Sequence, residues 1–487
     1  MLETTSSTVL KVKSFSGIWW IPESNQRWYG TLTFEIMGEQ SLKIISESEE
    51  LLLTQDDSSK IFHGNCIVDG FLKCVTVFHA LRTRSSSYEN DPNTLWQYVF
   101  SVNDIWISDV HFLKREDVKF TSFSFEMHNL EYWLNEKNVF KVQKNSETIA
   151  VSMKRLPVIK LFEDENVEIE INYHYNYPYS TLVQLATSMS YCPEIKIISK
   201  CGYLPYYGQQ NSFEYYWQCI YDFISLCIGG YTYFFNMLGF KGDTEKNVNS
   251  KVLFSCDITA KQRKNIYPSL ILFPYCELKD DWEKMIKKFF NQYSQVQHIY
   301  AGLKTCLHTF RYVPYMLPNL LYGLEGLQQS FYPDLDDPNN AAHSPQEDEY
   351  LQKVNTIIAL CPPELVQFAK DAMMKKVPYY KRVRGMIEDV ASFFPFLATR
   401  KVIQKLSFEI GQMRITAAHS QVRTEALDTN VIYFIFFIQY LQIAIIMKAL
   451  GLAENKIKKC YSNNSIGDLQ GMQVFFKQCY ASKGDKK

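Results

Sequence analysis

The pattern of apolar and polar positions divides the chain into a first part with a period of two and a second part with a helical period. The alternation is clearest in Tyr29–Ile36 (Y-G-T-L-T-F-E-I) and in Val167–His174 (V-E-I-E-I-N-Y-H). Successive side chains of a strand point to opposite faces, so each of these segments can bury one face and leave the other in water. Turn-rich breaks separate such segments. We therefore expect antiparallel sheet in the first part of the chain.

Two tryptophans in succession, Trp19 and Trp20, lie in Gly17–Glu23 (G-I-W-W-I-P-E), just before the first of these strands. On a strand they would point to opposite faces, so at most one of them can enter a given core. The other covers a second layer or stays exposed as a platform for a ligand, and packing is the interpretation that we favour. Further strands are predicted at Leu42–Ile45, Lys73–Phe78, Trp96–Val102, Val118–Phe125, Val252–Ser255 and Ser269–Phe273.

The pattern changes after Pro205. Ser212–Gly229 has the length and the apolar content of a buried helix, with Ser212 as a possible N-cap and Glu214 in its first turn. From Asp280 the spacing of apolar residues is helical almost to the end of the chain. The predicted helices are Asp281–Tyr293, Leu317–Phe331, Gln352–Leu360, Pro363–Lys375, Arg384–Phe394, Thr399–His419 and Thr429–Leu450, with Tyr332–Glu349 as a loop between two of them.

These elements predict an α+β protein with more than one domain. A chain of 487 residues is long enough to bury two or three separate cores. We expect an N-terminal β-rich domain at residues 1–279, antiparallel and sandwich-like, with a mixed part from about residue 212. An all-α helical bundle is expected to follow at residues 280–480.

The apolar run Val431–Met447 is long enough to raise the question of a membrane span. Gln439 and Gln442 interrupt it, and it falls short of the ~20 residues that a bilayer core requires before Lys448 is reached. We therefore expect a buried helix, or a helix packed against a second subunit, and no membrane association.

Composition narrows the class of protein. Hydrophobic residues make up 46% of the chain and charged residues 21%, as in ordinary globular proteins. The formal net charge of -1 gives no global attraction to nucleic acid, so such binding would need a local basic patch. Residues 1–13 lack the pattern of a secretory signal, and the 12 cysteines include no C-x-x-C pair. We expect free thiols and a cytoplasmic location.

Several familiar catalytic motifs are absent from the sequence. It contains no Walker loop, no G-x-G-x-x-G opening a helix, no H-E-x-x-H and no G-x-S-x-G nucleophile elbow. Asp334, Asp336 and Asp337 do not have the spacing of a calcium loop, and a solvated acidic loop is the interpretation that we favour. We predict neither a cofactor nor a metal site.

One pair of residues, Arg414 and His419, has the chemistry to cleave RNA without a metal. RNA carries its own nucleophile, the 2′-hydroxyl, so the reaction needs a base for that proton, an acid for the 5′-oxygen and a cation for the phosphorane. Histidine titrates near neutral pH and can act as the base or the acid. Arginine offers a permanently charged planar fork to phosphate oxygens. A two-fold dimer would supply two of each.

Helix geometry restricts how this pair can act. At about 100° per residue, side chains five residues apart point about 140° away from each other. Arg414 and His419 can therefore meet in one cleft only if the helix ends or bends between them, or if a partner helix crosses there. A purely structural interpretation is that Arg414 forms a salt bridge with Glu409 or Glu425, while His419 ends the helix.

Segments in both halves of the chain resemble a known family. The helical half resembles the HEPN superfamily of helical bundles, many of which are metal-independent endoribonucleases. More particularly, Gly17–Phe34 resembles the N-terminal domain of the ApeA family of bacterial anti-phage proteins. Leu320–Leu327 (L-L-Y-G-L-E-G-L), Arg414–His419 (R-x4-H) and Ala449–Leu452 resemble the HEPN domain of that family.

The resemblance implies that Arg414 and His419 are the catalytic pair of an endoribonuclease that acts as a homodimer through its HEPN bundle. It also implies that the β-rich domain restrains the nuclease or senses infection, for which a phage-derived trigger is a possible partner. Many active HEPN motifs have a polar residue, often Asn, directly after the arginine, where this chain has Ile415.

RNA must also be held. Lys375–Arg384 (K-K-V-P-Y-Y-K-R-V-R) places five basic residues around two tyrosines, a composition suited to phosphates and stacked bases. Lys381, Arg382 and Arg384 are the predicted RNA-binding residues, and a solvated start of a helix is the alternative.

Two other functions stay open at the level of sequence. One is a non-catalytic HEPN module that binds RNA, a nucleotide or a partner protein, which Ile415 and the near-neutral net charge favour. The other is carbohydrate binding by the aromatic residues of the β-rich domain.

Overall fold

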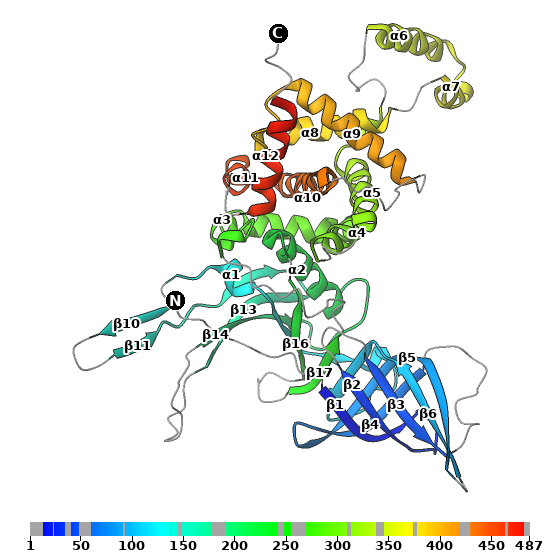
Figure 1. Ribbon diagram of the computed structural model, residues 1–487, viewed down its shortest axis with the longest axis vertical. Coiled ribbons are helices and arrows are strands. Elements are labelled where there is room, and N and C mark those ends of the chain that lie inside the picture. The colour runs from blue at the N-terminus through cyan, green and yellow to red at the C-terminus, as the bar shows by residue number, and fades with distance from the viewer. Residues whose placement is uncertain are drawn as a thin grey trace. The chain divides into compact units, whose positions relative to one another are not determined.

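The computed structural model describes most of the chain (Figure 1). The described residues are 13–22, 24–34, 40–47, 60–90, 93–137, 139–144, 149–176, 190–230, 232–241, 248–254, 268–308, 313–337, 345–373, 377–418, 429–462 and 466–481. The chain splits into two compact units, of which the first comprises Met1–Tyr221 and Thr232–Asn265 and the second Asp222–Tyr231 and Ile266–Lys487. The first is built on antiparallel sheet and the second is helical, which confirms the predicted order of a β-rich part and a helical bundle.

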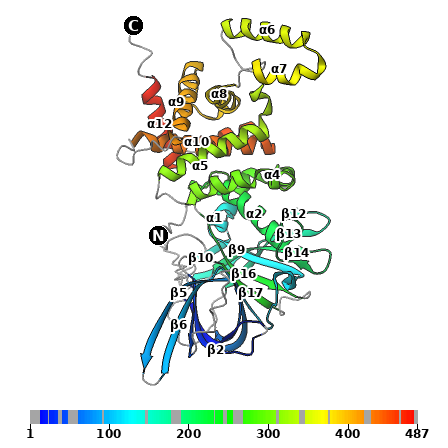
Figure 2. The same ribbon diagram turned by 90° about the vertical axis from the view of Figure 1, so that its right-hand side faces the viewer.

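Six strands of the first unit form a closed antiparallel sheet. They are β1 (Lys13–Trp20), β2 (Trp28–Phe34), β3 (Ser41–Ser46), β4 (Lys60–Val68), β5 (Phe71–Asn90) and β6 (Asn93–Ser101). They pair in the order β1-β2-β3-β6-β5-β4, and β4 returns to β1. Figure 2 shows β5 and β6 extending together beyond the rest of the ring. Closure removes the free edges that an open sheet would expose.

Alternation along each strand fills the interior of this ring. In β2, Trp28 and Leu32 are buried while Tyr29, between them, is exposed. Trp19 is fully buried in the same core, and its indole N–H donates to the carbonyl of Gly30 at 3.2 Å. Trp20 has the opposite parity on β1 and is only partly buried, at the edge of this core. The prediction that at most one of the two tryptophans enters this core is confirmed.

A seven-stranded sheet continues from the ring, because β5 also pairs with β7. Its order is β7 (Asp104–Ser108), β17 (Val248–Phe254), β16 (Phe234–Phe240), β9 (Ser122–Met127), β14 (Ser190–Ser199), β13 (Val167–Asn176) and β12 (Ile159–Glu163), all antiparallel. Two short pairs, β10 (Phe140–Lys144) with β11 (Ile149–Met153) and β8 (Lys119–Phe120) with β15 (Leu204–Pro205), accompany η2 (Arg115–Asp117) and α1 (Leu130–Leu134).

Helix α2 (Phe213–Ile228) begins as the sequence predicts. The Ser212 hydroxyl accepts a hydrogen bond from the backbone N–H of Tyr215 at 3.1 Å, so Ser212 is the N-cap. The ring of Phe213 lies against those of Phe120 and Phe123, at centroid distances of 6.4 Å and 5.8 Å. The first turn of the helix therefore packs on aromatic residues of the sheet.

The second unit is a helical bundle. Its elements are η4 (Pro268–Leu270), α3 (Tyr275–Leu278), α4 (Trp282–His308), α5 (Val313–Phe331), η5 (Pro333–Asp336), α6 (Pro345–Leu360), η6 (Pro363–Leu365), α7 (Val366–Met373), α8 (Tyr379–Val390), η7 (Ala391–Phe393), α9 (Arg400–Ala418), α10 (Thr429–Leu450), α11 (Glu454–Tyr461) and α12 (Gly467–Ala481). The predicted loop Tyr332–Glu349 is partly wrong, because η5 lies within it and α6 begins at Pro345.

The predicted strand Ser269–Phe273 is also wrong. Its backbone N–H groups at Leu272 and Phe273 donate to the carbonyls of Ile228 and Cys227, at 3.1 Å and 2.8 Å. These carbonyls belong to the last turn of α2, where they lack partners within the helix. The apolar side chains of this segment, which suggest a strand, are buried, but its backbone caps the end of α2 instead of pairing in a sheet.

Helix α10 occupies the centre of the bundle, where it contacts α4, α5 and α12 (Figure 1). Asn430–Leu450 is apolar enough to cross a membrane, with a mean hydropathy of 1.9, but 78% of that apolar stretch is buried inside the unit. The amide N–H of Gln442 donates to the carbonyl of Leu320 at 2.6 Å, so this donor has its partner within the core. The burial is that of a core helix.

Candidate functional site

The candidate site is built on α5, α8 and α9. In α5, the apolar face of L-L-Y-G-L-E-G-L is buried at Leu320, Leu321, Leu324 and Leu327. Two glycines allow neighbouring helices to approach closely. A Cβ at Gly323 would lie 2.9 Å from Oε1 of Gln442 in α10, and one at Gly326 would lie 2.9 Å from Ile299 in α4. Glu325 lies between these glycines and is the sole charged residue of α5.

Arg414 of α9 meets this carboxylate through a planar, two-pronged contact. Its Nη2 lies 3.0 Å and 2.8 Å from Oε1 and Oε2 of Glu325, and its Nε lies 3.2 Å from Oε2. The Arg414 side chain is 35% exposed and that of Glu325 is 21% exposed. The guanidinium is therefore held in one orientation while part of it still faces solvent, which is the arrangement that binding of an anion from solution would require.

An aromatic ring supports this pair. The guanidinium carbon of Arg414 lies 4.8 Å from the ring centroid of Tyr379, in the first turn of α8, and the hydroxyl of Tyr379 donates to the carbonyl of Leu321 at 3.3 Å. The hydrogen bonds to Glu325 raise the pKa of Arg414 above its usual value. Burial raises the pKa of the Tyr379 phenol, and the charge of Glu325 adds to that rise. Arg414 is thus cationic and Tyr379 neutral at any physiological pH.

The predicted RNA-binding residues lie on α8, and both arginines among them form ion pairs. Nη1 of Arg382 donates to Oε1 of Gln328 at 2.8 Å and to Oδ1 of Asp336 at 3.0 Å, and its Nη2 lies 3.8 Å from Glu325. Arg384 pairs with Glu388, one turn further along the helix, at 2.9 Å. Both arginine side chains are 14% exposed. Lys381 lies in the same turn and is half-buried.

The two members of the predicted catalytic pair are not both described. Arg414 lies in the last turns of α9, whereas His419 follows its final residue, Ala418, and is outside the described residues. Ile415 is 51% exposed. Glu409, considered above as a partner of Arg414, instead lies 3.9 Å from Lys405 and accepts a hydrogen bond from Tyr480. Glu425, the other partner considered, is also outside the described residues.

Sequence reasoning missed Glu325 and Tyr379 as members of this cluster. A signal for Glu325 was present, because it is the one charged residue in the nineteen of α5. A lone charge on an otherwise apolar helix must find a partner or face water. Nothing in the sequence, however, indicates that the partner is Arg414, which is 89 positions away.

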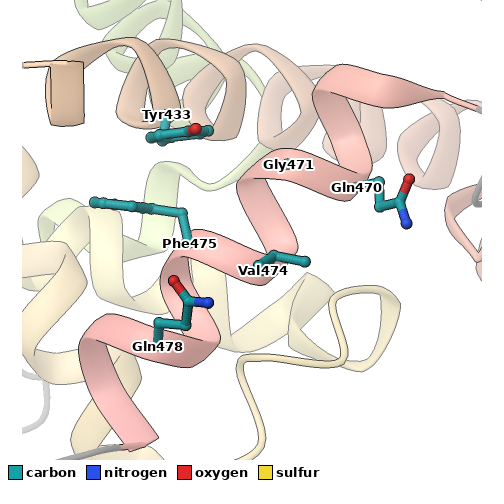
Figure 3. A pocket seen from close by; sticks show the side chains of 6 residues that line it. All are labelled: Tyr433, Gln470, Gly471, Val474, Phe475 and Gln478. Carbon is teal, nitrogen blue, oxygen red and sulfur yellow. The ribbon is translucent and has the colours of Figure 1, made fainter.

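A pocket lies between α10 and α12 (Figure 3). It has a volume of about 320 Å³ and is lined by Tyr433, Gln470, Gly471, Val474, Phe475 and Gln478. The rings of Tyr433 and Phe475 stack at a centroid distance of 4.5 Å, with an angle of 13° between their planes. This lining contains no carboxylate, histidine, cysteine or basic side chain, and the phenol of Tyr433 is its one group capable of acid–base catalysis. Among the residues that the structure describes, no group of His, Cys, Asp and Glu could hold a metal ion.

Comparison with known proteins identifies the first part of the chain. The family model described as ApeA N-terminal domain 1 matches residues 14–289, which is more than half of the chain. The match includes the paired tryptophans of β1 and extends through the seven-stranded sheet and α2 to the start of α4. No curated protein and no solved structure matches the chain. The chain therefore belongs to the ApeA family of anti-phage defence proteins.

Proposed function

We propose that the helical unit is a HEPN domain that cleaves RNA without a metal, with Arg414 and His419 as its catalytic pair. In this reaction the 2′-oxygen bonds to phosphorus as its proton leaves to a base, and the P–O5′ bond breaks as the 5′-oxygen gains a proton. The products are a 2′,3′-cyclic phosphate and a 5′-hydroxyl, and no oxidant or cofactor is consumed. His419 would serve as the base or the acid, and a homodimer would supply a second histidine and a second arginine.

The observation that carries this proposal is the geometry at Arg414. Its guanidinium is fixed by two-pronged hydrogen bonds to Glu325, lies over the ring of Tyr379, and is 35% exposed. A cation that is oriented before the substrate arrives costs little reorganisation when negative charge develops on the phosphorane. Arg382, 3.8 Å from the same carboxylate, adds a second guanidinium to the neighbourhood.

The family supplies the biological setting. The defence role follows from the ApeA N-terminal domain, and we propose that RNA cleavage is how the helical unit carries it out. In this scheme the β-rich unit senses infection or restrains the nuclease, and a phage-derived molecule releases it. Cleavage takes place in the cytoplasm, where both RNA and phage products are found.

The test is RNA cleavage by the purified full-length protein with and without His419. The His419→Ala variant is expected to lose at least about 100-fold in rate, because general acid–base catalysis contributes roughly 10²–10⁴-fold. A matched control is His298→Ala, which removes an exposed histidine of α4 and should leave cleavage unchanged. Activity should also persist in EDTA. Undiminished cleavage by the His419→Ala variant, or a strict need for a divalent metal, would refute the proposal.

One observation favours a second candidate function, a HEPN module that binds RNA, a nucleotide or a partner protein without cutting. The charge of Arg414 is already matched by Glu325, as in an ordinary structural ion pair. A dimer that binds RNA and leaves it intact between pH 5 and 9 would select this function over the nuclease.

A further inference from the structure

The outer face of the closed sheet carries a row of large apolar side chains that its own unit does not cover. The register places Ile18 of β1 opposite Tyr29 of β2, and Tyr29 opposite Ile45 of β3. Adjacent strands lie about 4.8 Å apart, so these three side chains are direct neighbours. Tyr29 is 74% exposed, Ile45 49% and Ile18 42%. We call Ile18, Tyr29 and Ile45 the outer row.

The neighbouring Trp20 shows what a covered ring looks like on the same face. The guanidinium carbon of Arg27 lies 4.3 Å from its ring centroid, and the rings of His111 and His63 lie edge-on to it at 4.9 Å and 5.8 Å. The ring of Trp20 is thus covered by side chains of its own unit. Tyr29 is far more exposed, and a planar ring between two aliphatic side chains is suited to stacking with another flat group.

Among the described residues around the outer row, cations outnumber acids. The six strands of the ring contain the basic residues Lys13, Lys43, Lys60, Lys73, Arg82 and Arg84, and the single acid Glu89, and Lys73 is already paired with Asp109 at 2.6 Å. Lys43 and Arg84 both pair with Val99, so they flank it on the outer face and extend from the outer row across β6. Arg27 lies two residues before Tyr29 and is exposed, while Glu47, directly after β3, is the nearest acid along that strand.

A stacking ring among lysines and arginines is the composition that binds single-stranded nucleic acid. The bases stack on aromatic rings and the phosphates contact cations, without a need for hydrogen bonds to base edges. A hydrophobic protein partner would explain the exposed Ile18 and Ile45, but not the two cations Lys43 and Arg84 on the same face. An anionic polymer with flat apolar groups explains both.

We infer that the outer row, with Lys43 and Arg84, binds single-stranded RNA, with a base stacked on Tyr29. The choice of RNA rests on the proposed function, because RNA is the polymer that the helical unit would cut. In this arrangement the β-rich unit holds a strand by a surface of its own, separate from the residues around Arg414. This surface would bind the unpaired bases and the phosphates of a single strand, without selecting a particular nucleotide sequence.

The experiment measures the affinity of the full-length His419→Ala protein for a fluorescent single-stranded RNA of about 15 nucleotides by anisotropy. Tyr29→Ala in that background should weaken binding about tenfold, since stacking on one ring typically contributes that much or more. Tyr29→Phe keeps the ring and should bind like the parent. Tyr203→Ala is the matched control, because Tyr203 lies in the same unit and is 60% exposed. Its affinity should be unchanged.

A salt titration tests the phosphate contacts. The double variant Lys43→Gln/Arg84→Gln removes two cations, so the slope of log K against log salt should fall by about 1.4, or about 0.7 for each contact to a single strand. If the His419→Ala protein, its Tyr29→Ala variant and its double variant all bound single-stranded RNA with equal affinity, the inference would be overturned. Tighter binding to single-stranded DNA, or equally tight binding to duplex RNA, would overturn it as well.

The outcomes of this experiment are separable from those of the cleavage test. If wild-type protein fails to cut RNA while Tyr29→Ala still weakens binding, the nuclease proposal fails and the RNA-binding surface stands. If wild-type protein cuts RNA but the Tyr29 and Lys43/Arg84 variants bind like the parent, the surface is refuted and the nuclease proposal stands. Binding of a protein from phage-infected cells to the outer row, with no affinity for RNA, would also refute the surface.

Discussion

The ion pair of Arg414 with Glu325 holds a partly exposed guanidinium in one orientation. Glu325 is 21% exposed and Arg414 35%, so the pair lies at the surface of the bundle rather than in its core. At such a site an ordinary salt bridge contributes about 0–1 kcal/mol to stability. The contact is therefore worth more as a means of orienting a guanidinium than as a source of folding free energy. An incoming phosphate would share the guanidinium with Glu325 or displace the carboxylate.

This view of Glu325 as a positioning residue predicts the effect of Glu325→Gln on RNA cleavage. The glutamine keeps one acceptor but loses the charged, two-pronged contact, so the guanidinium of Arg414 should be less well oriented. Since charge-assisted hydrogen bonds contribute about 1.5–3 kcal/mol, kcat should fall about tenfold or more. KM should not rise, because a negative charge beside the substrate phosphate has been removed. Steady-state kinetics measure both constants.

The matched control for this prediction is Glu409→Gln, which lies on α9 and has Lys405 and Tyr480 as partners. That variant should retain the wild-type kcat. An increase in KM without a change in kcat at Glu325→Gln would show that Glu325 shapes the binding surface but does not orient Arg414 for catalysis.

At the scale of elements, the sequence predicts most of the helices and strands but not how they connect. Helix α10 begins and ends where its apolar run predicts, because almost every position of that run is buried. The segment Ser269–Phe273 is not a strand because its backbone N–H groups at Leu272 and Phe273 cap the last turn of α2, and no local sequence pattern predicts that contact. Closure of the ring depends on β5, whose first half pairs with β4 and whose second half pairs with β6. The alternation of apolar and polar residues along a strand does not reveal that its two halves pair with different strands.

The packing of α5 on α4 predicts opposite effects for two glycine-to-alanine substitutions. Gly302 of α4 has room for a Cβ, whose nearest neighbour would be the carbonyl oxygen of Asn319 at 3.8 Å. Gly302→Ala should therefore raise the free energy of unfolding by about 0.5–1 kcal/mol, because alanine is the better helix former. At Gly326 the Cβ would lie 2.9 Å from Ile299, and overpacking of about 1–3 kcal/mol should outweigh that gain.

Urea denaturation followed by circular dichroism at 222 nm, where helices dominate the signal, measures both effects. The midpoint should rise for Gly302→Ala and fall for Gly326→Ala. A midpoint that rises equally for both variants would show that Ile299 moves aside freely, so that the close approach of α4 does not constrain the position of Glu325.

At the scale of the whole molecule, the sequence identifies the candidate site only in part. Arg414 could be found because an arginine five residues before a histidine suits RNA cleavage, and because the surrounding segments resemble a family. Glu325 and Tyr379 could not be assigned to it, since 89 and 35 positions separate them from Arg414 and only the packing of three helices brings them together. The family match ends at residue 289, so it establishes the ancestry of the β-rich unit and leaves the chemistry of the helical unit to experiment.

A composite site across a homodimer predicts that two inactive variants restore each other. Arg414→Ala and His419→Ala should each be inactive alone. In a heterodimer, the His419→Ala subunit supplies the arginine and the Arg414→Ala subunit supplies the histidine, so a shared cleft contains one of each.

Co-expression with two different tags and sequential affinity purification isolates this heterodimer. Its RNA cleavage should exceed that of either homodimer at least about tenfold, because one acid–base group typically contributes more than that. The same purification of two differently tagged Arg414→Ala chains is the control and should stay inactive. A heterodimer as inactive as this control would mean that each subunit needs its own arginine and histidine together, and a monomeric wild-type protein that still cuts RNA would exclude a shared cleft.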